Sequence, residues 1–426
     1  MAQPRAGDRR TRPTGPVAPG FRWFWTGETV SAAGSYVTVL ALQTLVVLDL
    51  GGDAQDVGWL NSSRWLPYLV IGLLVGAWVD RWPRRPVMIA TDLARAALLV
   101  AIPLAWWAGV LTLPVLLGVV VAFGAASLFN DAASQSFVTR LVPRPRLQQA
   151  HARLDTGDAA AQTTGPALAG GLVSLVGAPL AVLVDAVSFL LSAAVVWRLR
   201  VEEPPAVDRR ARPWHLRREV AAGVRWVYRD SGLTRLAVST HVWFAGQAVL
   251  GVVIAPYALV ELGLSAFQLG VAVACAGAGA VLGAAVTGAV GRLLGTGPTI
   301  AAARVLAVAA ALVTAGAASV GAGEQGTAVV VLATGQLLSG LGMGLSNSHE
   351  MAYRQLRTPD GLQARTNTTM RSVNRGILVV AAPAAGLLVV LVGNAAALLV
   401  AAAVFAVSVC VLLTPTMRAD RSTVST

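Results

Sequence analysis

The stretch from Gly76 to Pro86, GAWVDRWPRRP, is a short charged loop between two long apolar segments, residues 56–79 and 86–108. A helix that crosses a lipid bilayer needs about 20 mostly apolar residues, and each of these segments is long enough. The loop places one acid and three arginines where such helices would leave the membrane. The stretch therefore predicts two consecutive membrane-spanning helices joined by a tight polar turn.

The rest of the chain continues this pattern. Of its 426 residues, 55% are apolar and only 13% are charged, whereas soluble domains carry about 25% charged residues. A soluble fold of this length could not bury so much apolar surface, and the composition also excludes disorder, a disulfide scaffold and a coiled coil. Twelve spans are predicted: 21–48, 56–79, 86–108, 112–139, 148–176, 178–198, 233–260, 266–291, 298–320, 326–352, 363–392 and 394–415.

The distribution of arginine predicts the orientation. The 33 basic residues are all arginine and give a net charge of +12. Most of them lie in both tails, in the central loop and in every second short loop, whereas the alternate loops carry no arginine and contain acids such as Asp53, Glu261 and Glu324. Because cytoplasmic loops are enriched in arginine, both termini are expected in the cytoplasm, in a multi-pass protein of the plasma membrane. An excess of basic residues can also indicate nucleic-acid binding, but this is not expected here.

Two similar halves are indicated by matches at offsets close to half the chain. Gly165 to Gly177 resembles Ala382 to Gly393, and Asn130 matches Asn347. Parallel repeats of this kind occur in transporters. The predicted organisation is a flexible cytoplasmic tail (1–20), a six-helix bundle (21–198), a cytoplasmic linker that ends in an amphipathic helix (199–232), a second six-helix bundle (233–415) and a tail (416–426).

The loop after the second span carries the resemblance to a family. It resembles the Gly-x-x-x-Asp-Arg-x-Gly-Arg-Arg/Lys motif of the major facilitator superfamily, with Pro83 in place of the second Gly, and the matching residues are Gly76, Asp80, Arg81, Arg84 and Arg85. The resemblance implies an all-α membrane protein of twelve transmembrane helices, in which two six-helix bundles are related by a pseudo-two-fold axis. The implied activity is secondary active transport by alternating access.

The same residues are expected to form a cytoplasmic gate. Gly76 permits close helix contact, and Asp80 is placed to face a helix N-terminus and to pair with arginine. In the family, an acid at the position of Asp131 completes a charge relay, which implies a pair between Asp131 and Arg84. The alternative interpretation is that the loop charges only set the membrane topology.

Two further segments resemble one branch of the family. Asp92-x-x-Arg95, where the two charges can pair on one helix face, and Asn130-Asp131 followed by Val142-Pro143 resemble drug exporters such as macrolide and siderophore efflux proteins. The resemblance implies export of a small hydrophobic or amphipathic compound, similar to a drug, antibiotic or siderophore. An uptake transporter and a non-transporting receptor or regulator are the alternatives.

The fifth span resembles the Gly-Pro-x-x-Gly-Gly motif of exporters that exchange drugs for protons. Gly165 and Pro166 match, Ala169 replaces the next Gly, and Gly170 and Gly171 follow. Proline removes a helical hydrogen bond, so this span is expected to bend and to pack closely. An ordinary helix kink is the alternative, and the match implies protons as the coupling ion.

Charged residues inside membrane spans are costly and therefore mark candidate sites. The candidates are Glu28, Arg64, Asp158, Asp185, His241 and Arg304. Asp158, just before the Gly-Pro pair, is the expected proton-binding group, because desolvation favours the neutral form of an acid. Arg64 and Asp185 are expected to pair, whereas Glu28 and His241 are interpreted as structural.

No motif for an enzyme or a cofactor is present in the sequence. It contains no Gly-x-x-x-x-Gly-Lys-Ser/Thr nucleotide-binding loop, no His-Glu-x-x-His zinc motif and no Gly-x-Ser-x-Gly elbow. We expect no cofactor, no metal and no enzymatic activity. The expected partners are a small-molecule substrate, protons and the lipid bilayer, and a monomer is expected to be functional.

Overall fold

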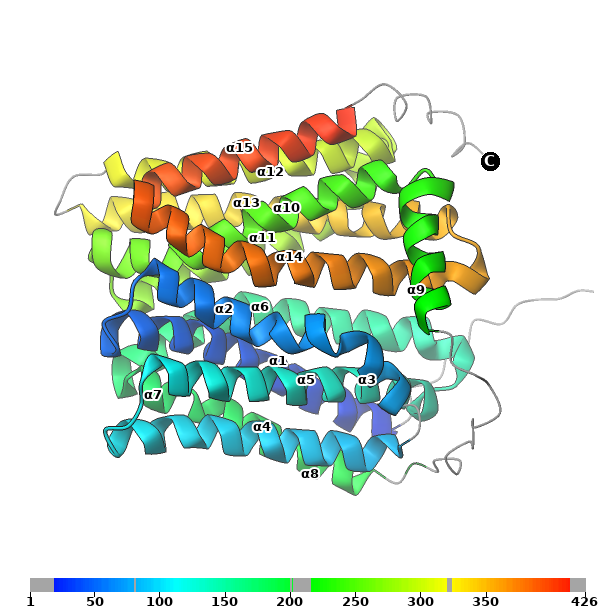
Figure 1. The fold of residues 1–426 in the computed structure, drawn as a ribbon, viewed down its shortest axis with the longest axis horizontal. Coiled ribbons are helices and arrows are strands. Elements are labelled where there is room, and N and C mark those ends of the chain that lie inside the picture. The colour runs from blue at the N-terminus through cyan, green and yellow to red at the C-terminus, as the bar shows by residue number, and fades with distance from the viewer. Residues whose placement is uncertain (1–18, 80–81, 200, 202–215, 320–323, 414–426) are drawn as a thin grey trace, which may run out of the picture.

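A computed structural model describes residues 19–79, 82–199, 201, 216–319 and 324–413. In these residues the regular secondary structure is entirely helical, as predicted. The helices run side by side and form two groups, which lie in the lower and upper halves of Figure 1. Asp80 and Arg81 of the loop motif, and most of the central linker, fall outside the described residues.

The first group holds the first half of the chain. It consists of α1 (Pro19–Thr44), α2 (Ala54–Val70), α3 (Gly72–Val79), α4 (Arg84–Trp107), α5 (Leu113–Leu141), α6 (Leu147–Val176), α7 (Ala178–Ala181) and α8 (Leu183–Arg198). The predicted second span is divided into α2 and α3 at Ile71, one turn after Pro67, which cannot donate a helical hydrogen bond. The predicted sixth span likewise contains both α7 and α8.

The second group holds the second half of the chain. It consists of α10 (Thr234–Pro256), α11 (Ala266–Leu294), α12 (Thr296–Gly316), α13 (Gln325–Leu356), α14 (Gln363–Val392) and α15 (Asn394–Leu413). Among the described residues, ten helices are individually long and apolar enough to cross a membrane. The divided span α2–α3 and the more polar α6 complete the twelve that the sequence predicts.

The two groups repeat the same turn between their first and second spans. In each, the first span ends in a π-helical turn followed by a glycine with positive φ, Gly51 at 64° and Gly263 at 62°. Two residues later a side chain, Asp53 or Ser265, caps the next helix in a capping box. Only glycine adopts positive φ without strain, so the match supports the predicted pseudo-two-fold relation.

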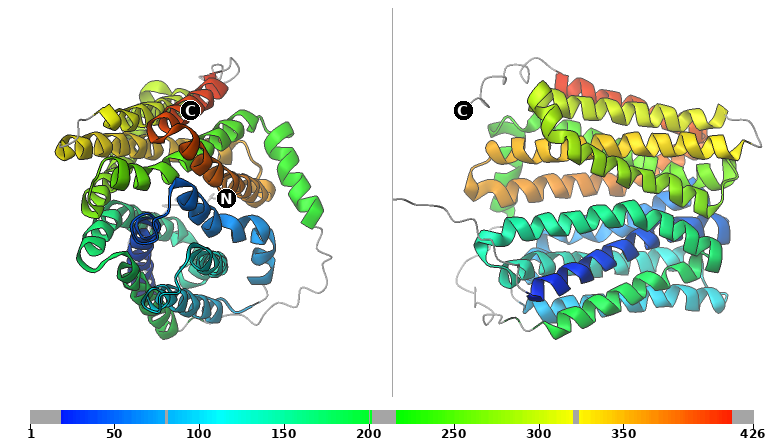
Figure 2. Two further views of the ribbon diagram at one scale, coloured as in Figure 1. Left: turned by 60° about the vertical axis from the view of Figure 1, so that its left-hand side comes forward. Right: turned by 180° about the vertical axis from the view of Figure 1, so that it is seen from behind.

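The ends of the molecule differ in how the two groups pack. Helix α9 (Leu216–Arg225) crosses one end, here named the linker end, and the opposite end is named the far end (Figures 1 and 2). At the far end one apolar core contains residues of both groups, such as Val46 and Val253. Towards the linker end, Phe137 belongs to a core of the first group alone, and Ile300 to a core of the second. The two bundles are therefore sealed together at the far end and have separate cores at the linker end.

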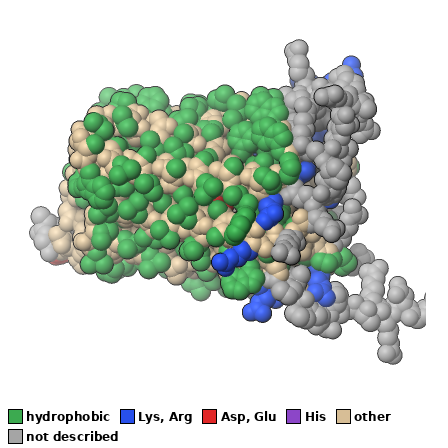
Figure 3. All heavy atoms as spheres, turned by 90° about the horizontal axis from the view of Figure 1, so that it is seen from below, with side chains coloured by type: hydrophobic (Ala, Val, Ile, Leu, Met, Phe, Trp, Pro, Cys, Tyr) green, Lys and Arg blue, Asp and Glu red, His purple; other side chains and the backbone are tan. Residues whose placement is uncertain are grey.

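Most of the packing between the bundles is made by two helix pairs, α2 with α14 and α6 with α11. The outer face seen in Figure 3 is mostly apolar, with arginine side chains gathered near the linker end. Large apolar side chains such as Leu175 and Leu293 are 82% and 83% exposed. Because a soluble monomer rarely exposes such large apolar patches, this surface is suited to lipid acyl chains.

Candidate functional site

Two arginines of the predicted gate, Arg84 and Arg85, donate hydrogen bonds to backbone carbonyls. Arg84 begins α4 and donates to the carbonyl of Trp82 at 3.2 Å. Arg85 donates from Nε to the carbonyl of Val196 at 3.1 Å and from a terminal nitrogen to Trp197. Arg85 therefore ties the start of α4 to the end of α8.

Asp131 has a different partner from the one expected. Its carboxylate accepts a hydrogen bond of 2.8 Å from the hydroxyl of Tyr68 on α2, and no ion pair joins it to Arg84 among the described residues. The Tyr68 ring is in turn covered by Arg375 of α14, whose guanidinium carbon lies 4.0 Å from the ring centroid. In this conformation Asp131 thus faces α2 and α14 instead of the loop.

A buried polar network occupies the interior of the first bundle. Arg95 pairs with Asp92 on the same helix, as their spacing predicts, and its guanidinium lies 4.0 Å from the Phe189 ring centroid. The amide of Asn130 on α5 donates to Asp92 at 3.0 Å and to the Thr91 hydroxyl at 2.8 Å. Asp92 is completely buried, so these contacts compensate for the loss of water around its charge.

The predicted pair between Arg64 and Asp185 is wrong. Asp185 is completely buried and accepts hydrogen bonds from the hydroxyls of Thr38 at 2.7 Å and Ser188 at 2.9 Å. Arg64 instead lies 5.4 Å from the ring of Trp65 and lines a small space of about 30 Å³ between α1, α2 and α5. The hydroxyls of Thr38 and Ser188 donate to the Asp185 carboxylate, so Asp185 has hydrogen-bond partners without an ion pair to Arg64.

The other acids considered for proton coupling lie on α1 and α6, which pack together. Asp158 interacts with the side chain of Tyr36 and with Asp155, one turn away on α6. Glu28 is partly buried and lies within electrostatic range of Asp92, Arg95 and Asp131. Both acids are thus near other charged or polar groups of the first bundle.

The Gly-Pro motif lies where three helices meet. Helix α6 continues through Pro166, while Gly165 packs against Tyr36 of α1 and Gly170 against α11 of the other bundle. A Cβ atom at Gly170 would be 2.4 Å from the carbonyl oxygen of Ala266, so only glycine fits. At Gly171, by contrast, a Cβ would first meet an atom at 4.0 Å. The motif therefore permits close contact between the bundles.

His241 is a bridge between the linker and α14. Its Nδ1 lies 2.6 Å from the side-chain oxygen of Asn374, and its Nε2 lies 2.6 Å from the hydroxyl of Tyr228, just beyond α9. The Asn374 oxygen can only accept, so Nδ1 donates to it, and in the neutral ring Nε2 then accepts from the Tyr228 hydroxyl. His241 is thus held by hydrogen bonds to residues on two different elements.

A cavity of about 360 Å³ lies among α10, α12, α13 and α14 in the second bundle. Trp243 and Phe244 form its aromatic part, with ring centroids 5.1 Å apart and nearly perpendicular planes. Gln247, Ser346 and Asn347 add polar groups, and the side-chain oxygen of Gln247 has no hydrogen-bond partner among the described residues. The cavity thus combines an aromatic surface with hydrogen-bonding groups, as small-molecule sites do.

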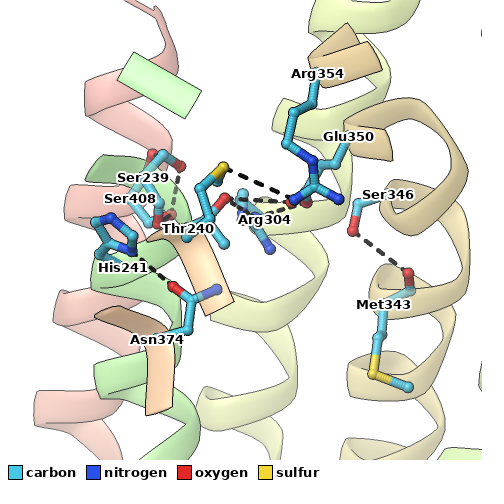
Figure 4. A network of polar contacts seen from close by, with 11 residues as sticks. Ser239, Thr240, His241, Arg304, Met343, Ser346, Glu350, Arg354, Asn374 and Ser408 are labelled. Carbon is cyan, nitrogen blue, oxygen red and sulfur yellow. Dashed lines mark hydrogen bonds and ion pairs between the residues drawn. The ribbon is translucent and has the colours of Figure 1, made fainter. Parts of the chain in front are cut away.

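An ion pair between α12 and α13 lines the cavity, and Figure 4 shows the two side chains together. Arg304 donates to Glu350 at 2.7 Å, and the second oxygen of Glu350 accepts from Thr240 at 3.2 Å. Arg304 also lies 4.9 Å from the Trp243 ring centroid. Both residues line the cavity, and the side chain of Arg304 is 3% exposed whereas that of Glu350 is 17% exposed.

Three of these residues were missed by the sequence analysis. Glu350 and Arg375 lie inside predicted spans, so the rule that selected Arg304 also applies to them. Tyr68 gives no signal in the sequence, because a tyrosine in an apolar span is usually part of the core.

The comparisons with known proteins agree with this architecture. The family model described as "Major Facilitator Superfamily" matches residues 24–375. The chain is 29% identical over 180 residues to the uncharacterized MFS-type transporter YfiS of Bacillus subtilis, covering 42% of each chain. It is 28% identical over 234 residues to the multidrug efflux pump Tap of Mycobacterium tuberculosis, covering 52% of this chain and 55% of Tap. The alignments thus span about half the length of these relatives.

The fold is also that of solved transporters. A crystal structure of a variant of the nucleoside transporter NupG superposes with a TM-score of 0.72 at 13% identity, covering 92% of this chain and 98% of NupG. At this identity the likeness establishes the fold alone, which is the twelve-helix arrangement predicted from the loop motif.

Proposed function

The chain belongs to the Major Facilitator Superfamily, and from this premise we propose that it exports a small hydrophobic or amphipathic compound. The superfamily membership agrees with a multi-pass membrane fold and supports transport of a small-molecule substrate. The direction of transport is proposed from the similarity to Tap, a multidrug efflux pump, and from the drug-exporter motifs in the sequence.

The cavity of the second bundle carries the proposal for the substrate site. Trp243 and Phe244 offer apolar contact area, while Gln247 and Glu350 offer hydrogen-bond acceptors. A compound with an aromatic or aliphatic body and a few N–H or O–H groups fits this combination. A bare inorganic ion would leave the aromatic surface unused.

Alternating access is proposed as the mechanism. The shared core at the far end and the separate cores at the linker end correspond to a state that is closed at the far end. We place the linker end in the cytoplasm, because cytoplasmic loops are enriched in arginine. The substrate would enter from that side, and rocking of the bundles would then open the far end.

Proton antiport is proposed as the energy source, with Asp158 as the first candidate for the proton-binding group. Asp158 lies on α6, two turns before the Gly-Pro motif that contacts the other bundle. Protonation there would neutralise a charge beside Tyr36 and Asp155, so it would change how α6 packs against α1.

The proposal is tested by efflux measurements on cells or proteoliposomes with a panel of amphipathic compounds. We expect at least one compound to be exported by the wild-type protein and export to stop on addition of a proton uncoupler. Asp80→Asn is expected to abolish export while the protein remains in the membrane. Energised uptake of the panel would favour an importer, and the absence of both processes would favour a receptor or regulator.

A further inference from the structure

The contact between Tyr68 and Asp131 engages an acid that the proposed gate assigns to Arg84. Tyr68 lies on α2, is 7% exposed and donates its hydroxyl to the Asp131 carboxylate at 2.8 Å. Asp131 itself is exposed on α5. One acid thus has two candidate partners, and in the present conformation the tyrosine is bound.

Arg375 contacts this pair from the other bundle. It lies on α14, and its guanidinium carbon is 4.0 Å from the Tyr68 ring centroid and 5.3 Å from the Trp65 ring. Within the described part of the chain its guanidinium makes these ring contacts and no hydrogen bond, and Asp131 attracts it over a longer range. Contacts of this kind are weak enough to break in a conformational change.

The Arg375–Tyr68 contact lies between the two bundles. Arg375 and Tyr68 join α14 to α2 on the linker-end side of the place where the bundles share a core. The next residue, Gly376, allows close approach, since a Cβ there would lie 3.1 Å from Leu69 of α2. The Arg375–Tyr68 contact is therefore a direct link between the bundles in the region that must move.

We propose that Arg375 is a positioning residue of the transport cycle, which holds Tyr68 on Asp131 while the linker end is open. When the linker end closes, Asp131 leaves Tyr68 and pairs with Arg84. The Asp131 carboxylate would thus bind Tyr68 in the state with an open linker end and Arg84 in the state with a closed linker end. This inference rests on the proposed alternating-access function.

Double electron–electron resonance between two spin labels tests the exchange without any substrate. The labels are placed at Gln149→Cys on α6 and Leu356→Cys on α13, which are exposed near the linker end, in a Cys275→Ser/Cys410→Ser background. The reconstituted protein is compared with Arg375→Gln, Arg375→Lys and Tyr68→Phe. Tyr68→Phe keeps the ring beneath Arg375 and removes only the hydroxyl that engages Asp131.

We expect Arg375→Gln and Tyr68→Phe to raise the ratio of short to long distances about fivefold, the size expected for loss of one cation–π contact or hydrogen bond. Arg375→Lys should fall between wild type and Arg375→Gln, because lysine keeps the charge and lacks the planar stacking surface. Adding Arg84→Gln to Arg375→Gln or to Tyr68→Phe should return the ratio of short to long distances to the wild-type value, because Asp131 then has no alternative partner.

A merely structural role would lower the thermal stability of the variants without moving the distance distribution. Unchanged distances in well-folded Tyr68→Phe, or a shift that Arg84→Gln does not cancel, would overturn the exchange. If no compound is transported by the wild type, the proposed function fails while the distance data still decide the exchange.

Discussion

Arg304 on α12 donates to Glu350 on α13 at 2.7 Å, and this pair forms the charged wall of the cavity in the second bundle. Both residues line the cavity, and the arginine is the more deeply buried of the two. Removing one member of a buried pair leaves an uncompensated charge, which costs more than the pair itself contributes. The two residues therefore allow folding and ligand binding to be tested separately.

Glu350→Gln is expected to destabilise the protein and to reduce transport. The substitution leaves the Arg304 guanidinium buried without its anion, which costs about 3 kcal/mol in comparable cases. Thermal unfolding in detergent should show a lower midpoint, and initial transport rates should fall at least about tenfold. Glu324→Gln, at an exposed position at the far end, is the matched control and should behave as wild type.

The double variant Arg304→Met/Glu350→Leu separates stability from binding. Replacing a whole buried ion pair by apolar side chains is often neutral for stability, so the unfolding midpoint should recover while transport stays low. Recovery of transport together with stability would show that the pair acts only in folding and that Glu350 does not bind the substrate.

Trp243→Ala is expected to weaken substrate binding. The indole forms the aromatic part of the cavity and also covers Arg304, so its removal takes away apolar contact area. For the exported compound identified in the efflux panel, the KM should rise about tenfold while the kcat changes less. Trp197→Ala is the control, because that side chain is 66% exposed on the outer face. An equal rise in the KM for Trp243→Ala and Trp197→Ala would contradict the proposal that this cavity binds the substrate.

The helical architecture could be predicted from the sequence, because the length and hydropathy of each segment indicate independently whether it can form a membrane-spanning helix. The Asp92–Arg95 pair was also predictable, since residues three apart on a helix share a face. The Gly-Pro motif lies on α6, within the predicted fifth span, and the structure adds that Gly170 contacts α11 of the other bundle.

Contacts between distant segments could not be predicted in the same way. Arg304 and Glu350 are 46 residues apart and belong to different helices, and His241 and Asn374 are 133 residues apart. Hydropathy reports whether a side chain is costly to bury, but not which helix faces it. For this reason Arg64 was assigned to Asp185, whereas the structure places two hydroxyls there.

Asp158 and Asp185 are expected to respond differently to neutralisation. Asp158→Asn should abolish the uncoupler-sensitive part of export, because it removes the proposed proton-binding group. Asp185→Asn should retain uncoupler-sensitive export and lower stability by about 1–2 kcal/mol, since Thr38 and Ser188 donate to a carboxylate that becomes a weaker acceptor. Efflux with and without the uncoupler, together with unfolding midpoints, checks both. The reverse pattern would assign coupling to Asp185.

Two adjacent glycines of α6 provide the sharpest test of the contact between bundles. At Gly170 a Cβ would lie 2.4 Å from the backbone oxygen of Ala266, and backbone cannot move aside as a flexible side chain can. Gly170→Ala is therefore expected to cost about 1–3 kcal/mol by overpacking and to separate α6 from α11 at the far end. At Gly171 the nearest atom would be 4.0 Å away, so Gly171→Ala should be neutral or slightly stabilising, because alanine favours helix over glycine. Both variants make the same chemical change one position apart, so equal unfolding midpoints and equal transport rates would show that α6 and α11 do not pack as closely as this structure requires.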